Sequence, residues 1–96
     1  MNTVGTALRV LRLEANMGIK TAGPLVGVSY SYLSKVENGK KTPSIGLISA
    51  LCELYGADAD DVIAKAGALP PDVSQIIRDH GKSAYDLLRS TYTETK

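Results

Sequence analysis

Apolar side chains recur along the chain with the period of an α-helix, and no stretch alternates strictly as a half-buried strand does. Val4, Leu8 and Leu11, for example, share one face of a helix near the N-terminus. Capping residues such as Ser44 and glycine stops such as Gly56 mark the ends of the periodic segments. The pattern therefore predicts an all-α protein. Its first five helices are expected at residues 3–15, 19–26, 29–38, 45–55 and 59–66.

Two more amphipathic helices are predicted beyond residue 67. Pro71 suits the first turn of one helix because its fixed φ is already helical, and Gly81 ends that helix. Ser83 is expected to cap the last helix. The apolar positions of this tail share one side of each helix: Val73, Ile76, Ile77, Ala84, Leu87, Leu88 and Tyr92. The chain thus divides into a five-helix domain, 1–67, and a C-terminal helical extension, 68–96.

The segment from Val28 to Ser44 carries the strongest functional signal. Ser29 is a suitable N-cap, and Leu33 and Val36 face inward at helical spacing. Gly39 stops the helix, because glycine adopts a left-handed conformation at little cost. The outward face is rich in hydroxyls, carries one cation and is followed by two lysines. Such a face suits a DNA groove and its phosphates.

This segment also resembles a known family. The run VGVSYSYLSKVENGKKTPS, residues 26–44, is similar to the helix-turn-helix core of the lambda-repressor/Cro (Xre-type) regulators. Glu37-Asn38-Gly39, followed four residues later by Pro43, is the most specific part, and the likeness extends over residues 4–67. The resemblance implies a lambda-repressor-like domain of five helices, with the two C-terminal helices added. It also implies a transcriptional regulator that binds double-stranded DNA as a dimeric repressor at a palindromic operator.

Site residues follow from the same resemblance. The outward positions of the recognition helix are expected to contact base edges, with Lys35 donating to guanine O6 or N7; they are Tyr30, Ser31, Ser34 and Lys35. Tyr32 is expected to be half-buried instead. Positions that hold the phosphate backbone are Lys20, Ser29, Asn38, Lys40, Lys41 and Thr42. Arg12 and Glu37 match a pair that forms a structural salt bridge in this family.

The second helix departs from the family pattern. Gly18 and Ile19 replace the usual polar cap and glutamine, and Gly23 replaces an alanine where two helices touch. Pro24 inside a helix would remove a hydrogen bond and clash with the preceding turn, at about 3 kcal/mol. If the helix begins with Thr21 as N-cap, Pro24 falls in the tolerated first turn. We therefore expect a short or distorted second helix.

The charge distribution agrees with a DNA-binding N-terminal part. The net charge is only +1, but residues 1–41 carry +4 and residues 42–96 carry −3. The basic part contains the helix-turn-helix, as electrostatic attraction to DNA requires.

Catalytic chemistry is nearly absent from the sequence. One cysteine, Cys52, and one histidine, His80, cannot supply the three or four protein ligands of a zinc site, and no glycine-rich phosphate loop is present. We expect a protein that is not an enzyme and needs no metal or cofactor. No apolar run approaches the roughly 18 residues of a membrane span. The single cysteine and the lack of a signal-peptide pattern are compatible with a cytoplasmic protein.

The tail admits several interpretations. Spare apolar positions on the first and fourth helices (Val10, Leu13, Leu47 and Leu54) can receive it in the same chain or in a second chain. A homodimer is favoured, because a two-fold dimer reads a palindrome. The alternative is an antitoxin-like or partner-regulated module, in which residues 68–96 bind a cognate toxin or peptidase and DNA binding provides autoregulation. A third possibility is a domain that keeps the fold but has lost its affinity for DNA.

Overall fold

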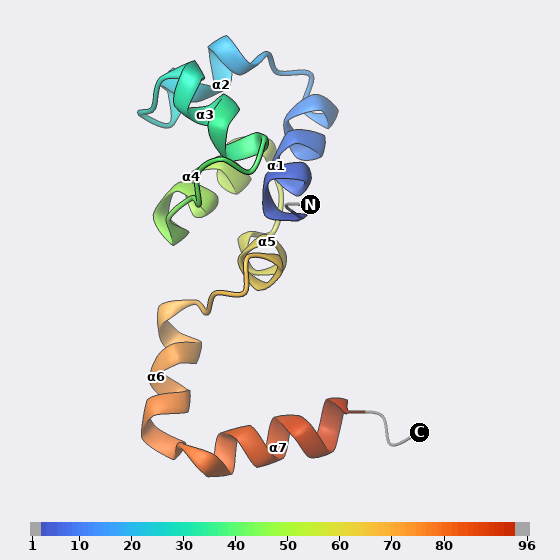
Figure 1. Ribbon diagram of the computed structural model, residues 1–96, viewed down its shortest axis with the longest axis vertical. Helices are drawn as coiled ribbons and strands as arrows, with labels where there is room; N and C mark the ends of the chain where they lie inside the picture. Colours follow the sequence, from blue (N-terminus) through green and yellow to red (C-terminus); the bar gives the residue numbers. More distant parts are fainter. Residues whose placement is uncertain (1–2, 94–96) are drawn as a thin grey trace.

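The computed structural model describes residues 3–93, and this part of the chain is entirely helical, as the apolar periodicity predicts (Figure 1). No strand occurs within it. The helices are α1 (Thr3–Glu14), α2 (Ile19–Leu25), α3 (Tyr30–Glu37), α4 (Ile45–Tyr55), α5 (Ala59–Lys65), α6 (Pro71–His80) and α7 (Lys82–Tyr92).

Helices α1 to α5 pack around one small aliphatic core. Every described side chain in the core comes from these five helices: Val4, Leu8, Ala22, Leu33, Val36, Ile48, Leu51, Cys52, Val62 and Ile63. Cys52 is completely buried, and its desolvation raises the pKa of its thiol. It therefore acts as a small packing residue.

The predicted N-caps Ser29 and Ser44 are confirmed, and Asp58 caps α5 in the same way. The side chains of Ser29, Ser44 and Asp58 each accept a hydrogen bond from a backbone N–H in the first turn, at 3.1, 3.1 and 2.9 Å. Gly56 ends α4 in the left-handed conformation, with φ of 75°. These bonds satisfy N–H groups that have no partner inside the helix, and they therefore fix where α3, α4 and α5 begin.

Helix α2 is short, as expected, but it does not begin at Thr21. It begins at Ile19 after an extended Gly18, and it has only seven residues. Pro24 is the next-to-last of them, so the helix lacks only one backbone N–H donor before it ends. The turn is closed by the N–H of Val28, which donates to the carbonyl of Gly23 at 3.0 Å.

The tail does not fold back onto the domain. Helices α6 and α7 pack on each other in an L, and none of their side chains is buried (Figure 1). The radius of gyration is 15.6 Å, against about 12–13 Å for a compact chain of this length. A single copy of the chain therefore leaves the apolar side of its tail in contact with solvent.

One expectation about the tail region is wrong. Ser83 does not cap α7, because the helix already begins at Lys82 after Gly81, whose φ is 55°. Leu47 and Leu54 are half-buried, because both pack against the core of α1 to α5. Val10 and Leu13 do remain exposed. None of the described helices is long and apolar enough to cross a membrane.

Candidate nucleic-acid interface

Helix α3 presents a polar face that the core holds in place. Leu33 and Val36 have no exposed surface, which anchors one side of the helix in the core. Tyr30, Ser31 and Lys35 are exposed on the other side, and Ser34 is half-exposed. Because α3 has only eight residues, its two buried apolar side chains fix the direction in which every outward residue points.

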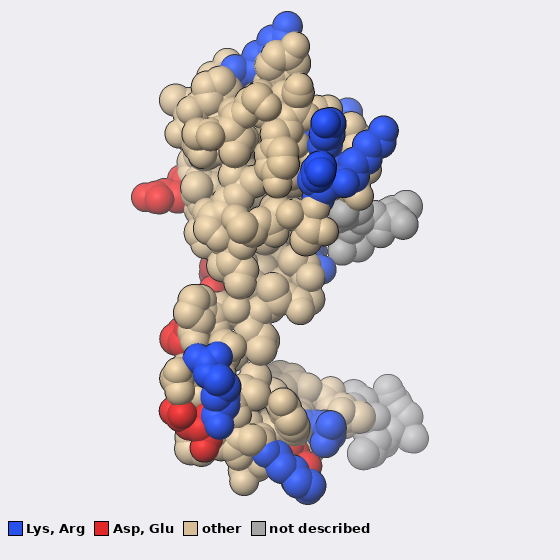
Figure 2. All heavy atoms as spheres, turned by 60° about the vertical axis from the view of Figure 1, so that its left-hand side comes forward, with Lys and Arg blue, Asp and Glu red and all other residues tan. Residues whose placement is uncertain are grey.

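The end of α3 brings three lysines together. Gly39, with φ of 79°, donates to the carbonyl of Val36, and the backbone N–H groups of Lys40 and Lys41 both donate to the carbonyl of Lys35, at 2.8 and 3.3 Å. This arrangement is a Schellman cap, which folds the chain back over the last turn. All three lysine side chains are exposed. Figure 2 shows lysine and arginine side chains gathered on one side of the part formed by α1 to α5.

A buried salt bridge ties the C-terminal end of α3 to α1. Arg12 Nε and Nη2 donate to the two carboxylate oxygens of Glu37 at 2.8 and 3.0 Å, and Nη1 donates to the carbonyl of Met17 at 2.9 Å. The two residues are 8% and 7% exposed. The hydrogen bond to Glu37 raises the pKa of the Arg12 guanidinium above its ordinary value, although desolvation by burial acts in the opposite direction. Gly5 on α1 also lies directly against the carbonyls of Val36 and Glu37.

Tyr55 of α4 lies beside this salt bridge. Its hydroxyl is buried, and within residues 3–93 no side chain or backbone group forms a hydrogen bond with it. Burial, followed by the negative charge of Glu37, raises the pKa of the Tyr55 hydroxyl to about 12. Tyr55 is therefore a packing residue that stays neutral at physiological pH.

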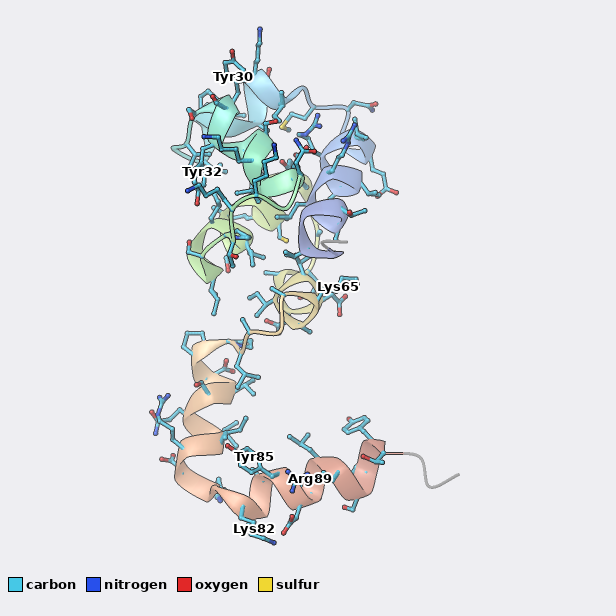
Figure 3. The ribbon with its side chains drawn as sticks, in the orientation of Figure 1. Tyr30, Tyr32, Lys65, Lys82, Tyr85 and Arg89 are labelled. Atoms are coloured by element: carbon cyan, nitrogen blue, oxygen red, sulfur yellow. The ribbon has the colours of Figure 1, made fainter. Side chains whose placement is uncertain are left out.

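Helix α2 meets the start of α3. A Cβ atom on Gly23 would lie 3.0 Å from the Val28 carbonyl oxygen and 3.1 Å from the Tyr30 nitrogen, so the two helices touch at this glycine. Lys20 Nζ lies 5.1 Å from the centroid of the Tyr30 ring. Tyr30 is 48% exposed, whereas Tyr32 packs partly against the core. Figure 3 places Tyr30 at the opposite end of the molecule from Tyr85 and Arg89 of the tail.

The residues predicted to contact DNA thus form one continuous region of the chain. The candidates for base contact all lie on α3. The candidates for phosphate contact flank them: Lys20 on α2, Ser29 at the cap, and Asn38, Lys40, Lys41 and Thr42 in the connection to α4. The contact between Lys20 and Tyr30 was not predicted, since no periodicity links residues ten positions apart in different helices.

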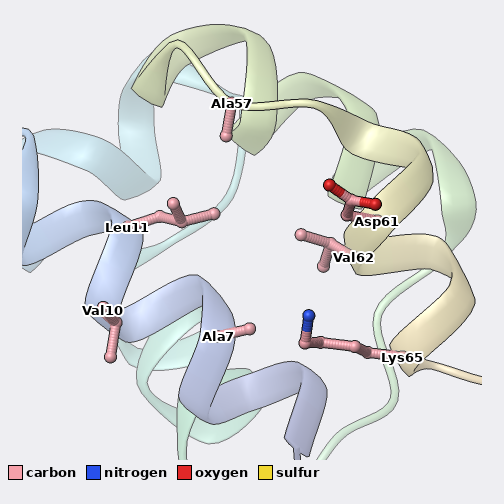
Figure 4. Close-up of a pocket in the computed structure, with 7 residues that line it drawn as sticks. All are labelled: Ala7, Val10, Leu11, Ala57, Asp61, Val62 and Lys65. Carbon is pink, nitrogen blue, oxygen red and sulfur yellow. The ribbon is translucent and has the colours of Figure 1, made fainter.

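A shallow pocket of about 350 Å³ lies between α1 and α5 (Figure 4). Its lining is apolar except for Asp61 and Lys65, which both belong to α5. Over residues 3–93 no group of three His, Cys, Asp or Glu side chains lies close enough to hold a metal ion.

The model of a helix-turn-helix domain family matches residues 3–64. The chain belongs to the helix-turn-helix family. The match covers α1 to α5 almost completely, which agrees with the resemblance drawn from residues 26–44. Curated relatives of the chain are transcriptional regulators, which agrees with the expectation that the chain is not an enzyme.

Relatives of this helix-turn-helix protein are transcriptional regulators. The chain is 31% identical over 80 residues to the HTH-type transcriptional regulator DdrOP3 of Deinococcus deserti, which covers 75% of the chain and 62% of that protein. It is 34% identical over 64 residues to the transcriptional regulator ClgR of Mycobacterium tuberculosis, covering 67% and 57%. The chain thus spans about three fifths of the length of these two curated relatives.

A solved structure extends the likeness to the tail. The crystal structure of the clp gene regulator ClgR from Corynebacterium glutamicum superposes with a TM-score of 0.63 at 25% identity. The superposition covers 97% of this chain and 94% of that chain, which includes α6 and α7. The two C-terminal helices therefore have a counterpart in a known regulator.

Proposed function

We propose that this protein is a sequence-specific DNA-binding regulator of transcription that acts as a dimeric repressor on a palindromic operator. Helix α3 enters the major groove, with Tyr30, Ser31, Ser34 and Lys35 toward the base edges. Lys20, Ser29, Asn38, Lys40, Lys41 and Thr42 hold the phosphate backbone on either side.

The observation that carries this proposal is the Schellman cap of α3. The cap places Lys40 and Lys41 next to Lys35 along the backbone, so the cations that neutralise phosphates lie directly beside the face that reads bases. The buried salt bridge holds the same end of α3 against α1. A rigid polar helix beside a fixed group of cations suits recognition in a DNA groove.

A second copy of the chain is the proposed occupant of the exposed side of the tail. Large apolar side chains with 45–77% exposure lie on it: Leu69, Ile76, Tyr85, Leu87, Leu88 and Tyr92. The charged side chains of α7 pair with one another, as Asp86 does with Lys82 and Arg89. Three cations and three anions between residues 71 and 92 leave no net charge to oppose self-association.

The position of the tail fits the same role. Tyr30 lies at the other end of the molecule, so pairing through the tail leaves α3 free for DNA (Figure 3). The counterpart of the tail in the ClgR structure supports a shared role for it.

The exposed tail also supports a second candidate function. In an antitoxin-like or partner-regulated module, the same apolar side of residues 68–96 binds a cognate toxin or peptidase. A hollow of about 270 Å³ between α6 and α7, lined by Ile76, His80, Ser83, Ala84 and Leu87, can receive an apolar side chain from such a partner. A monomer with a stable, exposed tail favours this function, whereas a dimer that buries the tail favours a simple repressor.

Selection from a random-sequence DNA library tests the proposed function. We expect a palindromic site with half-sites about one helical turn apart, bound with an affinity that falls steeply with salt. Lys35→Met relaxes the preference at one base position, because a hydrogen-bond donor to a DNA base is lost. Lys40→Met weakens all sequences alike, because only a phosphate contact is lost. Enrichment of no sequence by the wild-type protein contradicts the proposal.

The oligomeric state tests the role of the tail. We expect analytical ultracentrifugation to show a dimer for the wild-type chain and a monomer for Leu87→Ser, whose side chain is 66% exposed in the single copy. Leu25→Ser is a matched control, because Leu25 is similarly exposed, at 61%, but lies on α2. A monomeric wild-type chain refutes dimerisation without touching the DNA-binding proposal.

A further inference from the structure

Lys20 and Tyr30 form a contact between two helices at the proposed DNA face. Lys20 is the second residue of α2 and Tyr30 is the first residue of α3. The ammonium nitrogen lies 5.1 Å from the ring centroid, within the range of a cation–π interaction. Both side chains are exposed, so neither is held in place by the core.

The backbone sets up this contact. Gly23 lets α2 approach the backbone of Tyr30 so closely that any added Cβ atom would press on it. The backbone of Tyr30 is therefore fixed beside α2, while its side chain can adopt several rotamers. An exposed cation–π contact favours the paired rotamer by about two- to fivefold over the others. Lys20 is thus the group that biases the direction of the Tyr30 ring.

We infer that Lys20 is a positioning residue for base recognition: its ammonium holds the Tyr30 ring in the orientation that reads DNA and also faces a phosphate. This inference rests on the proposed DNA-binding function and adds a specificity role for a residue outside the recognition helix. With one ring face against Lys20, the edge and the hydroxyl of Tyr30 are left for a base or its sugar–phosphate. Exclusion of water by bound DNA strengthens the ammonium–ring attraction further.

A lysine that only neutralises a phosphate behaves differently. Its loss weakens binding to every sequence by the same factor, because phosphates carry no sequence information. Loss of a positioning lysine also lets the Tyr30 ring leave its orientation, so discrimination falls at the base positions that Tyr30 reads. The effect of Lys20 on discrimination must therefore vanish when the ring is absent.

A double-mutant cycle with Lys20→Met and Tyr30→Leu separates these two roles. Dissociation constants are measured for the wild type, both single variants and the double variant against the selected operator and its single-base variants. Lys20→Arg is the conservative variant, because arginine keeps the charge and stacks on aromatic rings. Lys40→Met is the matched control, since it removes one exposed cation from the connection after α3.

We expect Lys20→Met to lower discrimination two- to fivefold at the positions that Tyr30→Leu affects, about the size of the rotamer bias. It should have no effect on discrimination in the Tyr30→Leu background, and Lys20→Arg should restore the preference. Uniform weakening by Lys20→Met, as with Lys40→Met, overturns the inference while leaving the proposed function intact. If the wild type selects no DNA sequence, the proposed function itself fails.

Nuclear magnetic resonance of the free protein tests the contact independently of DNA. The chain has five tyrosines, and Tyr30→Leu assigns the ring signals of Tyr30 in a protein with labelled tyrosine. We expect Lys20→Met to shift these signals and to leave the other tyrosine rings unchanged. Unchanged Tyr30 signals overturn the contact, and with it the positioning role, whatever the DNA measurements show.

Discussion

The salt bridge between Arg12 and Glu37 is predicted to dominate the response of the domain to mutation. Arg12→Met removes the guanidinium and leaves a carboxylate that is only 3% exposed without a cation. It also removes the donor to the Met17 carbonyl, the contact at 2.9 Å. Glu37→Leu has the converse effect, because it leaves the charged Arg12 guanidinium buried without its carboxylate partner.

The expected loss is large on the scale of this protein. Removing one partner of a buried ion pair costs about 3–5 kcal/mol, whereas an exposed pair is worth only about 0.2–1 kcal/mol. The exposed fractions of 10% and 3% for the two side chains place this pair in the first group. A chain of 96 residues has a total stability of about 5–14 kcal/mol. Either single variant is therefore expected to lose about a fifth of it or more.

Urea denaturation monitored by circular dichroism measures these losses, with the slope of free energy against urea serving as a check on two-state behaviour. The double variant Arg12→Met/Glu37→Leu leaves no buried charge and should lose much less than the sum of the single losses. Lys82→Met, which breaks an exposed pair with Asp86, is the control and should cost less than about 1 kcal/mol. Single losses below about 1 kcal/mol, or additive losses in the double variant, would refute the reasoning.

Three further predictions concern glycine packing, pH and salt. Gly5→Ala should destabilise the protein by about 1–3 kcal/mol in urea melts, because its Cβ would lie 2.5 Å from a backbone carbonyl oxygen. Gly46→Ala should stabilise it by about 0.5–1 kcal/mol, because the nearest atom to its Cβ would be 3.9 Å away. Equal effects of the two substitutions would contradict this packing. The pKa of Tyr55 is raised to about 12 by burial, so above pH 10 the unfolded state loses this proton first and stability should fall as the pH rises to 12. In urea melts, the stability of Tyr55→Phe should fall less than that of the wild type between pH 10 and 12. If the two proteins lose the same stability over this range, the raised pKa of Tyr55 is refuted. Lys40→Met and Lys41→Met should each reduce the slope of log affinity against log salt by about 0.9, and an unchanged slope would exclude a phosphate contact.

Some of the site could be predicted from the sequence because its causes are local. Ser29 caps α3 through a backbone group three residues away, and Gly39 ends it by a conformation that glycine adopts easily. Pro24 likewise predicts a short α2 through the hydrogen bond it cannot make. The start of α2 at Ile19 agrees with the predicted range 19–26, but the sequence also leaves a start at Thr21 open, because an extended Gly18 without a side-chain cap bond gives no local signal.

Other features have causes that no local pattern contains. The Ser83 cap failed because Gly81, with φ of 55°, lets α7 begin two residues earlier than a hydroxyl signal suggests. From the sequence alone, Leu47 and Leu54 are expected to receive the tail, and the way α4 lies on the core gives both residues neighbours within the domain and leaves them half-buried. An apolar residue shows that a contact is needed and does not show which element provides it.

The helices, their inward faces and the recognition segment can be read from the sequence, because period, caps and stops act over a few residues along the chain. Contacts between distant residues depend on the folded structure. Among them, Lys20 lies over Tyr30, α6 and α7 have no cover in a single copy, and Arg12 meets Glu37, 25 residues away, a pair that only the family resemblance predicts. These outcomes depend on how helices pack in three dimensions, since packing is a property of whole surfaces that come together only on folding.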